Sequence, residues 1–475
     1  MVLLPLLHRR LGRPLFLPAH GRGAALPPAL RKLLRRRAGI WDLPELPQIG
    51  GPLESEGAVG ASQHQAAMAM GVSRCWYGVN GATGLLQAAL LAISQPGQAV
   101  LLPRNAHRSL IQACLLGDLV PLLFDLPFQA DRGHPAPADE PWIKTVLSEL
   151  PESHPSIAAA VLVHPTYQGY ANDPEPLIRC FHQRGWPVLV DEAHGSHLAT
   201  AVDPELPPSA VQAGADLVVH SLQKSSGGLA QTAVLWLQGD RVDPKRVERS
   251  LSWLQTTSPS ALLLASCEAS LADWQTRNGL NRLKRRLDEA RDLKSRLIRD
   301  GLPLLDTQDP LRLVLHTGSV GISGLEADAW LLPRGLIGEL PEPATLTLCL
   351  GLARQRGLRQ QLKELWQQLL IALPNRSAFP PFQRPPLPLV NQPDLPLGQA
   401  WRAPSRSLPL DLAENRIAAE LLCPYPPGIP LLVPGEGLDR GRLEWLLKQQ
   451  DLWGEQIPSH LAVVDNDSAR PESLP

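Results

Sequence analysis

Short apolar segments alternate with helical segments through the middle of the chain, from about residue 60 to about residue 260. The apolar segments are short and partly β-branched, so we interpret them as buried strands: Ala99–Leu102, Val120–Phe124, Ala158–Val163, Val188–Val190, Leu217–Val219 and Ala233–Leu237. The helical segments between them include Gly84–Ile93, Arg108–Leu116 and Asp173–Gln183. This alternation predicts an α/β fold with a large, doubly wound and mostly parallel sheet.

Polar residues follow three of these strands. Thr166 comes after the strand that ends at Val163, Asp191-Glu-Ala-His-Gly follows Val190, and Ser221-Leu-Gln-Lys follows Val219. Ligands of open parallel sheets bind beyond the carboxyl ends of the strands. We therefore expect these polar residues to line one binding site.

A lysine, a carboxylate and a loop of small residues in this arrangement predict a site for pyridoxal phosphate. This cofactor is an aldehyde that a lysine amine, here Lys224, holds as an imine. A buried carboxylate such as Asp191 keeps the pyridine nitrogen protonated, because an opposite charge favours the charged form. Backbone N–H groups of Gly81–Gly84 at a helix start, aided by the Ser221 hydroxyl, suit the phosphate.

Other interpretations of these residues were weighed. Asp191 also fits a helix N-cap, and Gly81–Gly84 alone also fits a simple turn. His194 and His197 have a spacing that suits a metal, but the run offers no third ligand, so we expect no metal. The string Asp191-Glu-Ala-His also occurs in nucleic-acid-dependent ATPases, yet the chain has no Gly-Lys dipeptide for a phosphate loop.

Composition excludes several classes of partner. The 45 basic and 46 acidic side chains leave a net charge of −1, which gives no overall attraction for nucleic acid or an anionic membrane. The six cysteines are scattered, as expected for reduced thiols. No apolar run reaches the ~18 residues of a membrane span, and the first residues lack the order of a signal peptide. We expect a cytoplasmic protein.

The chain divides into five parts by composition and pattern. We expect an N-terminal arm over 1–50, a large sheet domain over 51–270, a small α/β domain over 271–375, a proline-rich linker over 376–408, and a C-terminal unit with a polar tail over 409–475.

Several motifs together resemble those of the Orn/Lys/Arg decarboxylases, which are pyridoxal-phosphate enzymes of the aspartate-aminotransferase fold. These motifs are Asn80-Gly-Ala-Thr-Gly, Pro103-Arg-Asn-Ala-His-Arg-Ser, His164-Pro-Thr-Tyr-Gln-Gly, Asp191-Glu-Ala-His-Gly and Ser221-Leu-Gln-Lys. Leu17-Pro-Ala-His-Gly-Arg-Gly, Gln255-Thr-Thr-Ser-Pro-Ser, Pro424-Tyr-Pro-Pro-Gly-Ile-Pro and Pro434-Gly-Glu are similar to that family too. The chain looks like the short form without an N-terminal wing domain.

The resemblance implies roles for residues around the cofactor ring. Lys224 would form the imine and Asp191 would pair with the pyridine nitrogen. His107 would stack on one face of the ring and Ala193 would pack against the other. His194 is a candidate proton donor beside the reacting carbon.

The resemblance also implies roles at the phosphate. Ala82, Thr83 and Ser221 would hold it, and Gln223, which stands where the family usually has histidine, can still donate a hydrogen bond. Thr256 would reach the phosphate of a neighbouring subunit, which implies a homodimer, or a higher oligomer, with shared active sites.

The activity implied is decarboxylation of a basic amino acid (lysine, arginine or ornithine) to its amine, feeding polyamine metabolism. One alternative is an aminotransferase or aldolase on the same fold. An aminotransferase needs an arginine, for instance Arg312 or Arg354, to hold the substrate carboxylate. Another alternative is an inactive cofactor-binding relative, which Gln223 and the loop Ser225-Ser-Gly-Gly favour.

A basic substrate carries a distal cation, and an enclosed site must offer it a carboxylate. The acidic candidates in the late motif region are Glu414, Glu420 and Glu436. Glu436 follows Pro434-Gly435 in a rigid turn, which would fix the direction of its side chain. An alternative for each of the three residues is that it is a solvated acid on the surface.

Overall fold

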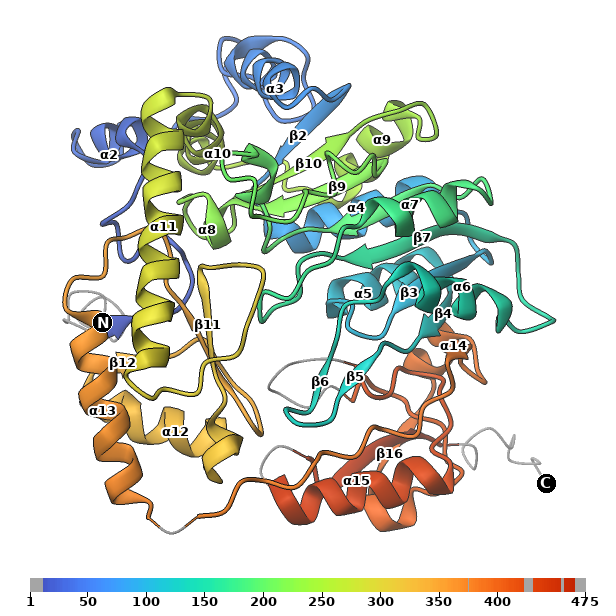
Figure 1. Cartoon of the computed structure of the whole chain (residues 1–475). Coiled ribbons are helices and arrows are strands. Elements are labelled where there is room, and N and C mark those ends of the chain that lie inside the picture. The colour runs from blue at the N-terminus through green and yellow to red at the C-terminus, as the bar shows by residue number, and fades with distance from the viewer. Residues whose placement is uncertain (1–11, 375, 423–429, 454–456, 466–475) are drawn as a thin grey trace.

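A sheet of eight strands forms the centre of the molecule (Figure 1). The computed structural model describes residues 12–374, 376–422, 430–453 and 457–465. The strand order is β15-β4-β3-β7-β8-β9-β10-β2, and the five strands from β4 to β9 are parallel. Their bounds are β2 Arg74–Gly78, β3 Ala99–Pro103, β4 Val120–Phe124, β7 Ile157–Val163, β8 Val188–Asp191, β9 Leu217–Ser221, β10 Ala233–Leu237 and β15 Val390–Asn391. The prediction of a mostly parallel α/β sheet is confirmed.

Alternate residues of the central strands enter two separate cores, one on each face of the sheet. In β3, Ala99 and Leu101 belong to one core, and Val100 and Leu102 belong to the other. Helices α3 Gly57–Met70, α6 Glu140–Ser148, α7 Glu175–His182 and α10 Ala261–Trp274 cover the first face. Helices α4 Gly81–Ile93, α5 Arg108–Gly117 and α9 Pro244–Leu254 cover the second face. Burial on both faces explains why these strands have continuous apolar sequences.

Some element boundaries differ from the sequence prediction. Strand β2 was missed because only three apolar residues separate Arg74 from Gly78. The sequence predicts a short helix over Pro28–Arg37, whereas helix α2 spans Pro28–Leu34. The sequence predicts an amphipathic helix over Leu352–Leu373, whereas helix α13 spans Leu358–Ala372, because Gly357 has a positive φ of 72° directly before it.

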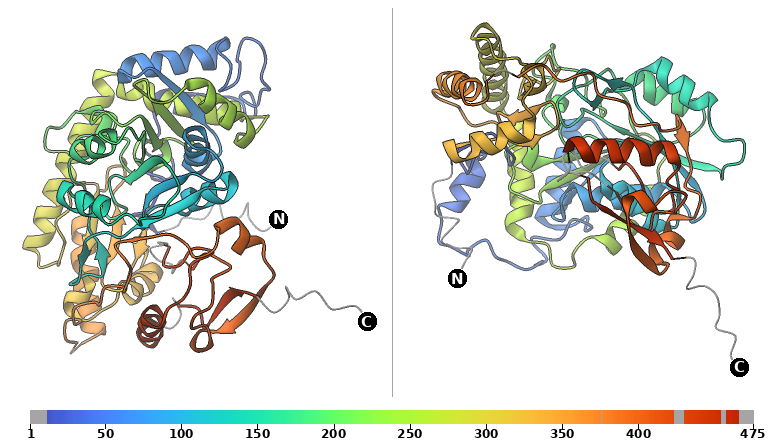
Figure 2. Two further views of the ribbon diagram at one scale, coloured as in Figure 1. Left: turned by 90° about the vertical axis from the view of Figure 1, so that its right-hand side faces the viewer. Right: turned by 90° about the horizontal axis from the view of Figure 1, so that it is seen from below.

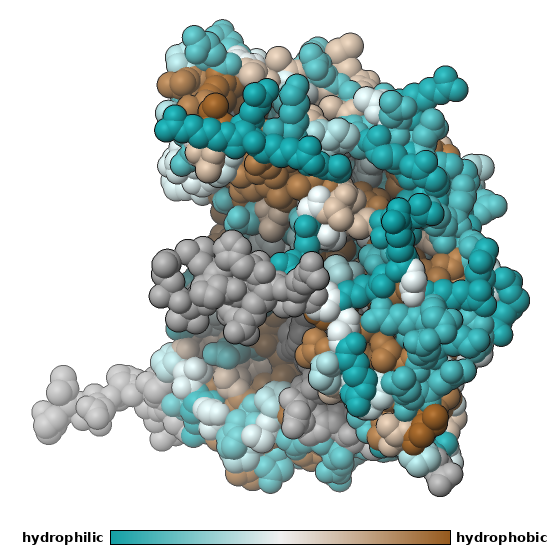
Figure 3. All heavy atoms as spheres, turned by 90° about the vertical axis from the view of Figure 1, so that its left-hand side faces the viewer, coloured by the Kyte–Doolittle hydropathy of each residue, from teal (hydrophilic) through white to brown (hydrophobic). Residues whose placement is uncertain are grey.

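A smaller α/β part packs beside the sheet. Its three-stranded sheet has the order β11-β14-β13, with β11 Arg312–Leu315, β14 Leu346–Cys349 and β13 Leu340–Pro341. Helices α11 Arg277–Arg299, α12 Gly324–Leu331 and α13 enclose a leucine-rich core with these strands. The N-terminal arm joins this part through β1 Arg13–Pro14, which pairs with β12 Leu336–Ile337. Figure 3 shows the outer face on this side, which is largely hydrophilic with smaller apolar patches.

The proline-rich segment over 376–408 runs along the protein rather than standing free. Its strand β15 pairs with β4 at the sheet edge, and the segment continues into α14 Leu397–Arg402 and β16 Ser405–Pro409. Strand β16 pairs with β17 His460–Val464, and α15 Arg440–Trp453 completes a small C-terminal unit with its own core (Figures 1 and 2). The hairpin β5 Phe128–Gln129 and β6 His134–Pro135 projects from the large sheet domain.

Some sequence features lie outside the described residues: Cys423, the motif from Pro424 to 429 and the tail after 465. The cysteines at 75, 114, 180, 267 and 349 are buried free thiols. Within the described ranges, no helix combines the length and apolarity that a membrane crossing requires.

One buried ion pair fastens the C-terminal unit to the large domain. The carboxylate of Glu436, which is fully buried, accepts hydrogen bonds from both terminal nitrogens of Arg104, at 2.5 and 3.3 Å. It also accepts from Asn391 Nδ2 at 2.6 Å and from the Val433 N–H at 2.9 Å. Burial opposes ionisation of Glu436, but the charge of Arg104 and these hydrogen bonds hold its pKa below the ordinary value.

The first prediction is that Glu436→Gln destabilises the protein by about 3–5 kcal/mol, because Arg104 is left as an unpaired buried charge. Urea unfolding of the full chain measures the loss. Glu444→Gln, which removes an exposed ion pair to Arg440, is the control and should cost less than about 1 kcal/mol.

The pH dependence of this loss has a definite sign. The pKa of Glu436 is lower in the folded protein, so its stabilisation is complete above its unfolded pKa of about 4.3 and is lost as pH falls through the folded value. The stability difference between wild type and Glu436→Gln should therefore shrink in acid. Equal unfolding of the two proteins at neutral pH would contradict the assignment.

Candidate active site

A cavity of about 940 Å³ opens beyond the carboxyl ends of β7, β8 and β9. Its walls come from strand ends, from the start of α4 and from the C-terminal unit. Among its lining residues are Ala82, Thr83, His107, Thr166, Tyr167, Asp191, Ala193, His194, Ser221, Gln223, Lys224, Trp401, Glu420 and Leu421. The polar residues that follow the strands are thus brought together.

The register of the parallel strands explains this meeting. Val163 of β7 pairs with Asp191 of β8, which pairs with Val219 of β9, so the three strands end at almost the same level. Strand β9 ends at Ser221 and continues into a one-turn helix, α8 Leu222–Ser225. This turn carries Lys224 into the cavity.

Lys224 lies among aromatic and cationic side chains. Its Nζ is 2.8 Å from His194 Nε2 and 5.9 Å from the centre of the Tyr167 ring. The rings of Tyr167 and His194 are 4.4 Å apart, centre to centre. The second ring nitrogen of His194, Nδ1, is 3.3 Å from Nη2 of Arg312.

Burial shifts the ionisation of both basic groups. It lowers the pKa of Lys224 from its ordinary value, although the charges of Asp191 and Glu339 oppose the shift. It also lowers the pKa of His194 well below the ordinary value, and the nearby charges of Lys224 and Arg312 act in the same direction. Burial therefore keeps His194 neutral near pH 7 and favours the free-amine form of Lys224.

The start of α4 can hold an anion. The helix begins at Gly81, whose φ of +71° is unfavourable for other residues, and Ala82 and Thr83 of its first turn line the cavity. The first N–H groups of a helix have no partner within the helix and carry partial positive charge. The hydroxyl-bearing Ser221 lines the same cavity.

Asp191 and Glu192 have different surroundings at the end of β8, because Asp191 lines the cavity and Glu192 does not. Asp191 lines the cavity, and its Oδ1 accepts from the Ala193 N–H at 3.1 Å. Glu192 is fully buried behind it and accepts from Ser209 Oγ at 2.5 Å, from the Ala210 N–H at 2.9 Å and from a ring nitrogen of His220.

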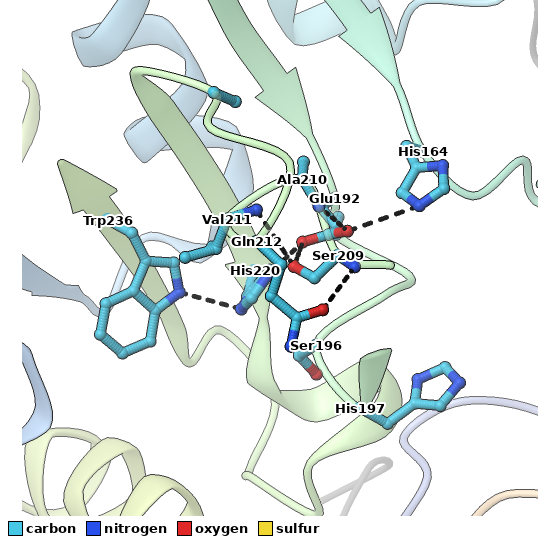
Figure 4. Close-up of polar contacts among 12 residues, drawn as sticks. His164, Glu192, Ser196, His197, Ser209, Ala210, Val211, Gln212, His220 and Trp236 are labelled. Carbon is cyan, nitrogen blue, oxygen red and sulfur yellow. Dashed lines mark hydrogen bonds and ion pairs between the residues drawn. The ribbon is translucent and has the colours of Figure 1, made fainter. Parts of the chain in front are cut away.

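The protonation of this buried cluster follows from its donors. Trp236 Nε1 can only donate, and it lies 2.9 Å from His220 Nδ1, so Nδ1 accepts. The ring proton of His220 is therefore on Nε2, which donates to Glu192 Oε2 at 2.6 Å (Figure 4). Glu192 thus ties the loop after β8 to β9 and so fixes the position of Asp191.

His107 has two roles in the structure. It is the N-cap of α5, where its Nδ1 accepts from the Ser109 N–H at 3.3 Å, and its ring also lines the cavity. Burial lowers its pKa, with Asp191 opposing the shift.

Three predicted site residues lie outside the cavity. Thr256 is exposed just past the end of α9, and Glu414 is exposed on the C-terminal unit. Glu436 is the buried partner of Arg104 rather than a carboxylate directed at a substrate. Of the three acids proposed for the substrate, Glu420 lines the cavity.

The spacing of His194 and His197 does not create a metal site. His197 is buried and its Nε2 bonds Asp309 Oδ1 at 3.2 Å, whereas the ring nitrogens of His194 face Lys224 and Arg312. Over the described part of the chain, no group of three or more potential ligands could hold a metal ion.

Sequence reasoning missed the contribution of Tyr167, Arg312 and Trp401. Tyr167 stands within His164-Pro-Thr-Tyr-Gln-Gly, and its position after β7 was the available signal. Arg312 was considered only as a ligand of a substrate carboxylate, but it is 1% exposed and lies behind His194. Arg354, the other arginine considered, has a side chain that is 69% exposed and is 3.6 Å from Glu289.

Family comparison agrees with this architecture. The sequence model of the Orn/Lys/Arg decarboxylase major domain matches residues 40–312, and that of the Orn/Lys/Arg decarboxylase C-terminal domain matches residues 388–460. The chain therefore belongs to the Orn/Lys/Arg decarboxylase family.

Particular relatives align over most of the chain. The arginine decarboxylase of Bacillus subtilis (strain 168) is 28% identical over 447 residues, which cover 92% of this chain and 90% of that protein. The arginine decarboxylase of Halalkalibacterium halodurans is 29% identical over 447 residues, covering 90% and 89%. The structure of lysine decarboxylase A from Pseudomonas aeruginosa has a TM-score of 0.75 at 16% identity, covering 93% of this chain and 80% of that one. This likeness confirms the expected aspartate-aminotransferase-like fold.

Proposed function

We propose that the protein is a pyridoxal-phosphate-dependent decarboxylase of a basic amino acid: arginine, lysine or ornithine. The observation that carries the proposal is that Lys224, Asp191 and the start of α4 line one cavity, in a chain of the Orn/Lys/Arg decarboxylase family. The arginine and lysine decarboxylases that the chain resembles support a basic substrate.

The residues of the cavity fit the cofactor. Lys224 would hold it, because a neutral amine is the reactive form and burial lowers the pKa of this lysine. Asp191 would keep the pyridine nitrogen protonated. The His107 ring and Ala193 both line the cavity and suit the two faces of a planar ring. When bound, the cofactor supplies an electron sink for the pair that remains after the carboxylate leaves.

The phosphate end of the site has matching donors. The N–H groups of Ala82 and Thr83 stand at the positive end of α4, and the Ser221 hydroxyl and the Gln223 amide line the same cavity. Gln223 can donate a hydrogen bond without carrying charge, so its replacement of histidine is compatible with phosphate binding.

His194 is the proposed proton donor. Its Nε2 is 2.8 Å from Lys224 Nζ. Either group could therefore donate a proton to the substrate carbon that has lost its carboxylate, if that carbon is held next to Lys224. Tyr167 packs on the His194 ring, and His194 is only 9% exposed.

The positions of the arginines favour decarboxylation over amino transfer. Neither Arg312 nor Arg354 lines the cavity, and Arg108, which does, is an exposed residue of the first turn of α5. A substrate carboxylate that is not held in an ion pair departs more readily, because an ion pair would stabilise the ground state.

The distal cation of the substrate would meet Glu420. Glu420 belongs to the wall formed by the C-terminal unit, together with Trp401 and Leu421. A carboxylate beside apolar side chains suits a long aliphatic chain that ends in a positive charge. The amine formed would feed polyamine synthesis in the cytoplasm.

The active form would be a homodimer with shared sites. Thr256 is exposed, and the nearby Trp253 is 83% exposed, as expected for a surface that a second copy covers. The chain segment just before Thr256 lies next to the start of α4, since Nδ2 of Asn80, the N-cap residue of α4, donates to the Leu254 carbonyl at 3.1 Å.

The second prediction concerns cofactor and reaction together. The full chain supplied with pyridoxal phosphate should absorb visible light, borohydride should fix the label on Lys224, and carboxyl-labelled arginine, lysine or ornithine should release carbon dioxide. Lys224→Ala should lose both properties, whereas Lys245→Ala, at an exposed lysine, should keep them. A keto-acid product without carbon dioxide would favour the aminotransferase, and a coloured but inert protein would favour the inactive relative.

The third prediction is that Glu420→Gln raises the KM for the basic amino acid and leaves cofactor affinity nearly unchanged. Loss of a charge-assisted hydrogen bond of about 1.5–3 kcal/mol corresponds to roughly ten- to a hundredfold in KM. Steady-state kinetics with cofactor titration measure both quantities. Glu414→Gln is the matched control, because Glu414 is exposed and outside the cavity, and equal KM values for the two variants would assign the cation to another group.

The fourth prediction tests the shared site. In hybrid dimers of Lys224→Ala and Thr256→Ala subunits, one site should carry both defects and the other should carry neither. Cofactor titration of isolated hybrids should then show one site of wild-type affinity and about half of the wild-type activity. If Thr256 serves its own subunit, the functional site of the hybrid would instead keep the weakened affinity of Thr256→Ala.

A further inference from the structure

Three basic side chains from different parts of the fold form a hydrogen-bonded row. Lys224 comes from α8, His194 from the loop after β8, and Arg312 from the start of β11. Lys224 Nζ is 2.8 Å from His194 Nε2, and His194 Nδ1 is 3.3 Å from Arg312 Nη2. A row of three potential cations in a buried place requires that some of them be neutral.

The hydrogen-bonding capacity of each group determines its proton count. A guanidinium only donates and stays charged, so His194 Nδ1 must accept from Arg312 and carries no proton. The single proton of the neutral imidazole is then on Nε2. This Nε2–H faces Lys224 Nζ, which can accept it only as a neutral amine, because an ammonium group has no lone pair.

We propose that Arg312 is a positioning residue: by donating to Nδ1 of His194, it fixes the Nε2–H tautomer, and this tautomer holds Lys224 as a hydrogen-bonded free amine. The inference rests on the proposed function, since it assigns the state of the lysine that would hold the cofactor. Arg312 acts through His194 and does not line the cavity.

The surroundings of Arg312 fix its place. Its side chain is 1% exposed, and its Nη1 is 3.7 Å from Asp309 Oδ2. Asp309 is in turn bonded by His197 at 3.2 Å. Burial opposes ionisation of Asp309, but the charges of His197 and Arg312 hold its pKa at about 2.

The loop after β7 leaves room for this arginine. Gly169 has a φ of +92°, and a Cβ placed on it would lie 2.8 Å from Arg312 Cγ. A side chain at this position would therefore displace the stem of the arginine. The close approach of Gly169 and the ion pair with Asp309 together direct the guanidinium toward His194.

The charge state of Lys224 also depends on other groups around it. Those groups, from the elements packed against Lys224, are Asp191, Glu339, Arg312, Cys349, His107 and Tyr167. Asp191 and Glu339 favour the ammonium form, so a free amine at neutral pH needs a group that opposes them. The Nε2–H of His194 is such a group, since it is a donor that an ammonium cannot accept.

The fifth prediction is that Arg312→Met raises the pKa of Lys224 by about one unit or more, because a His194 ring freed from Arg312 can turn its lone pair toward the lysine and favour the ammonium. Trace acetylation of the cofactor-free full chain over a range of pH, read by mass spectrometry, measures this pKa. Labelling of Lys224 near pH 7 should fall about tenfold. Arg312→Lys, which keeps a donor and a charge, should retain most of the wild-type labelling, and exposed Lys245 serves as the internal reference.

A double-mutant cycle separates the relay from a direct charge effect. If Arg312 acts through His194, Arg312→Met should shift the pKa of Lys224 far less when His194→Phe is already present. An equal shift in both backgrounds would show simple charge repulsion and would overturn the proposal. No shift in either background would overturn it as well.

A measurement on the wild-type protein needs no substitution. Neutron diffraction from cofactor-free crystals of the full chain should show hydrogen on His194 Nε2, none on Nδ1, and two rather than three on Lys224 Nζ. Hydrogen on Nδ1 would refute the proposal even if the protein decarboxylates basic amino acids. Conversely, a chain with the expected hydrogens but no decarboxylase activity would refute only the proposed function.

Discussion

The common level at which β7, β8 and β9 end is the constraint on which the rest of the site depends. Because Val163, Asp191 and Val219 share one row of the sheet, the residues that follow them emerge into the same space. A shift of one residue in β8 would turn Asp191 toward the interior and Glu192 toward the cavity. The buried hydrogen bonds of Glu192 to Ser209, Ala210 and His220 oppose that shift. These bonds therefore help to keep Asp191 at the cavity.

The buried carboxylate of Glu436 is stabilised by several partners at once. The carboxylate of Glu436 has Arg104, an asparagine amide and a backbone N–H around it, and it attaches the C-terminal unit that supplies one wall of the cavity. Where two basic groups meet, at Lys224 and His194, burial lowers the pKa of both and so favours their neutral forms. The same low-dielectric surroundings therefore strengthen the ion pairs that position the site and favour the uncharged form of the proposed reactive amine.

Much of the fold and of the site could be predicted from the sequence, because strands buried on both faces are short apolar runs and because ligands bind where such strands end. That reasoning placed Asp191 and Lys224 at one site, and both line the same cavity. It could not find the partner of Glu436, since Arg104 is 332 positions away in the sequence. The turn next to Pro434 restricts the backbone at Glu436, but it does not show which residue the side chain contacts. Arg312 was interpreted as a possible carboxylate ligand for the same reason: its contact with His194 spans 118 positions and arises only when β11 packs against the large domain.

The most direct test of the central claim is a cryo-electron microscopy or crystal structure of the full chain with pyridoxal phosphate. We expect density that is continuous from Lys224 Nζ to the cofactor, a phosphate at the N–H groups of Ala82 and Thr83, and the ring nitrogen beside Asp191. Cofactor density attached to a different lysine, or a phosphate bound away from the start of α4, would contradict the account.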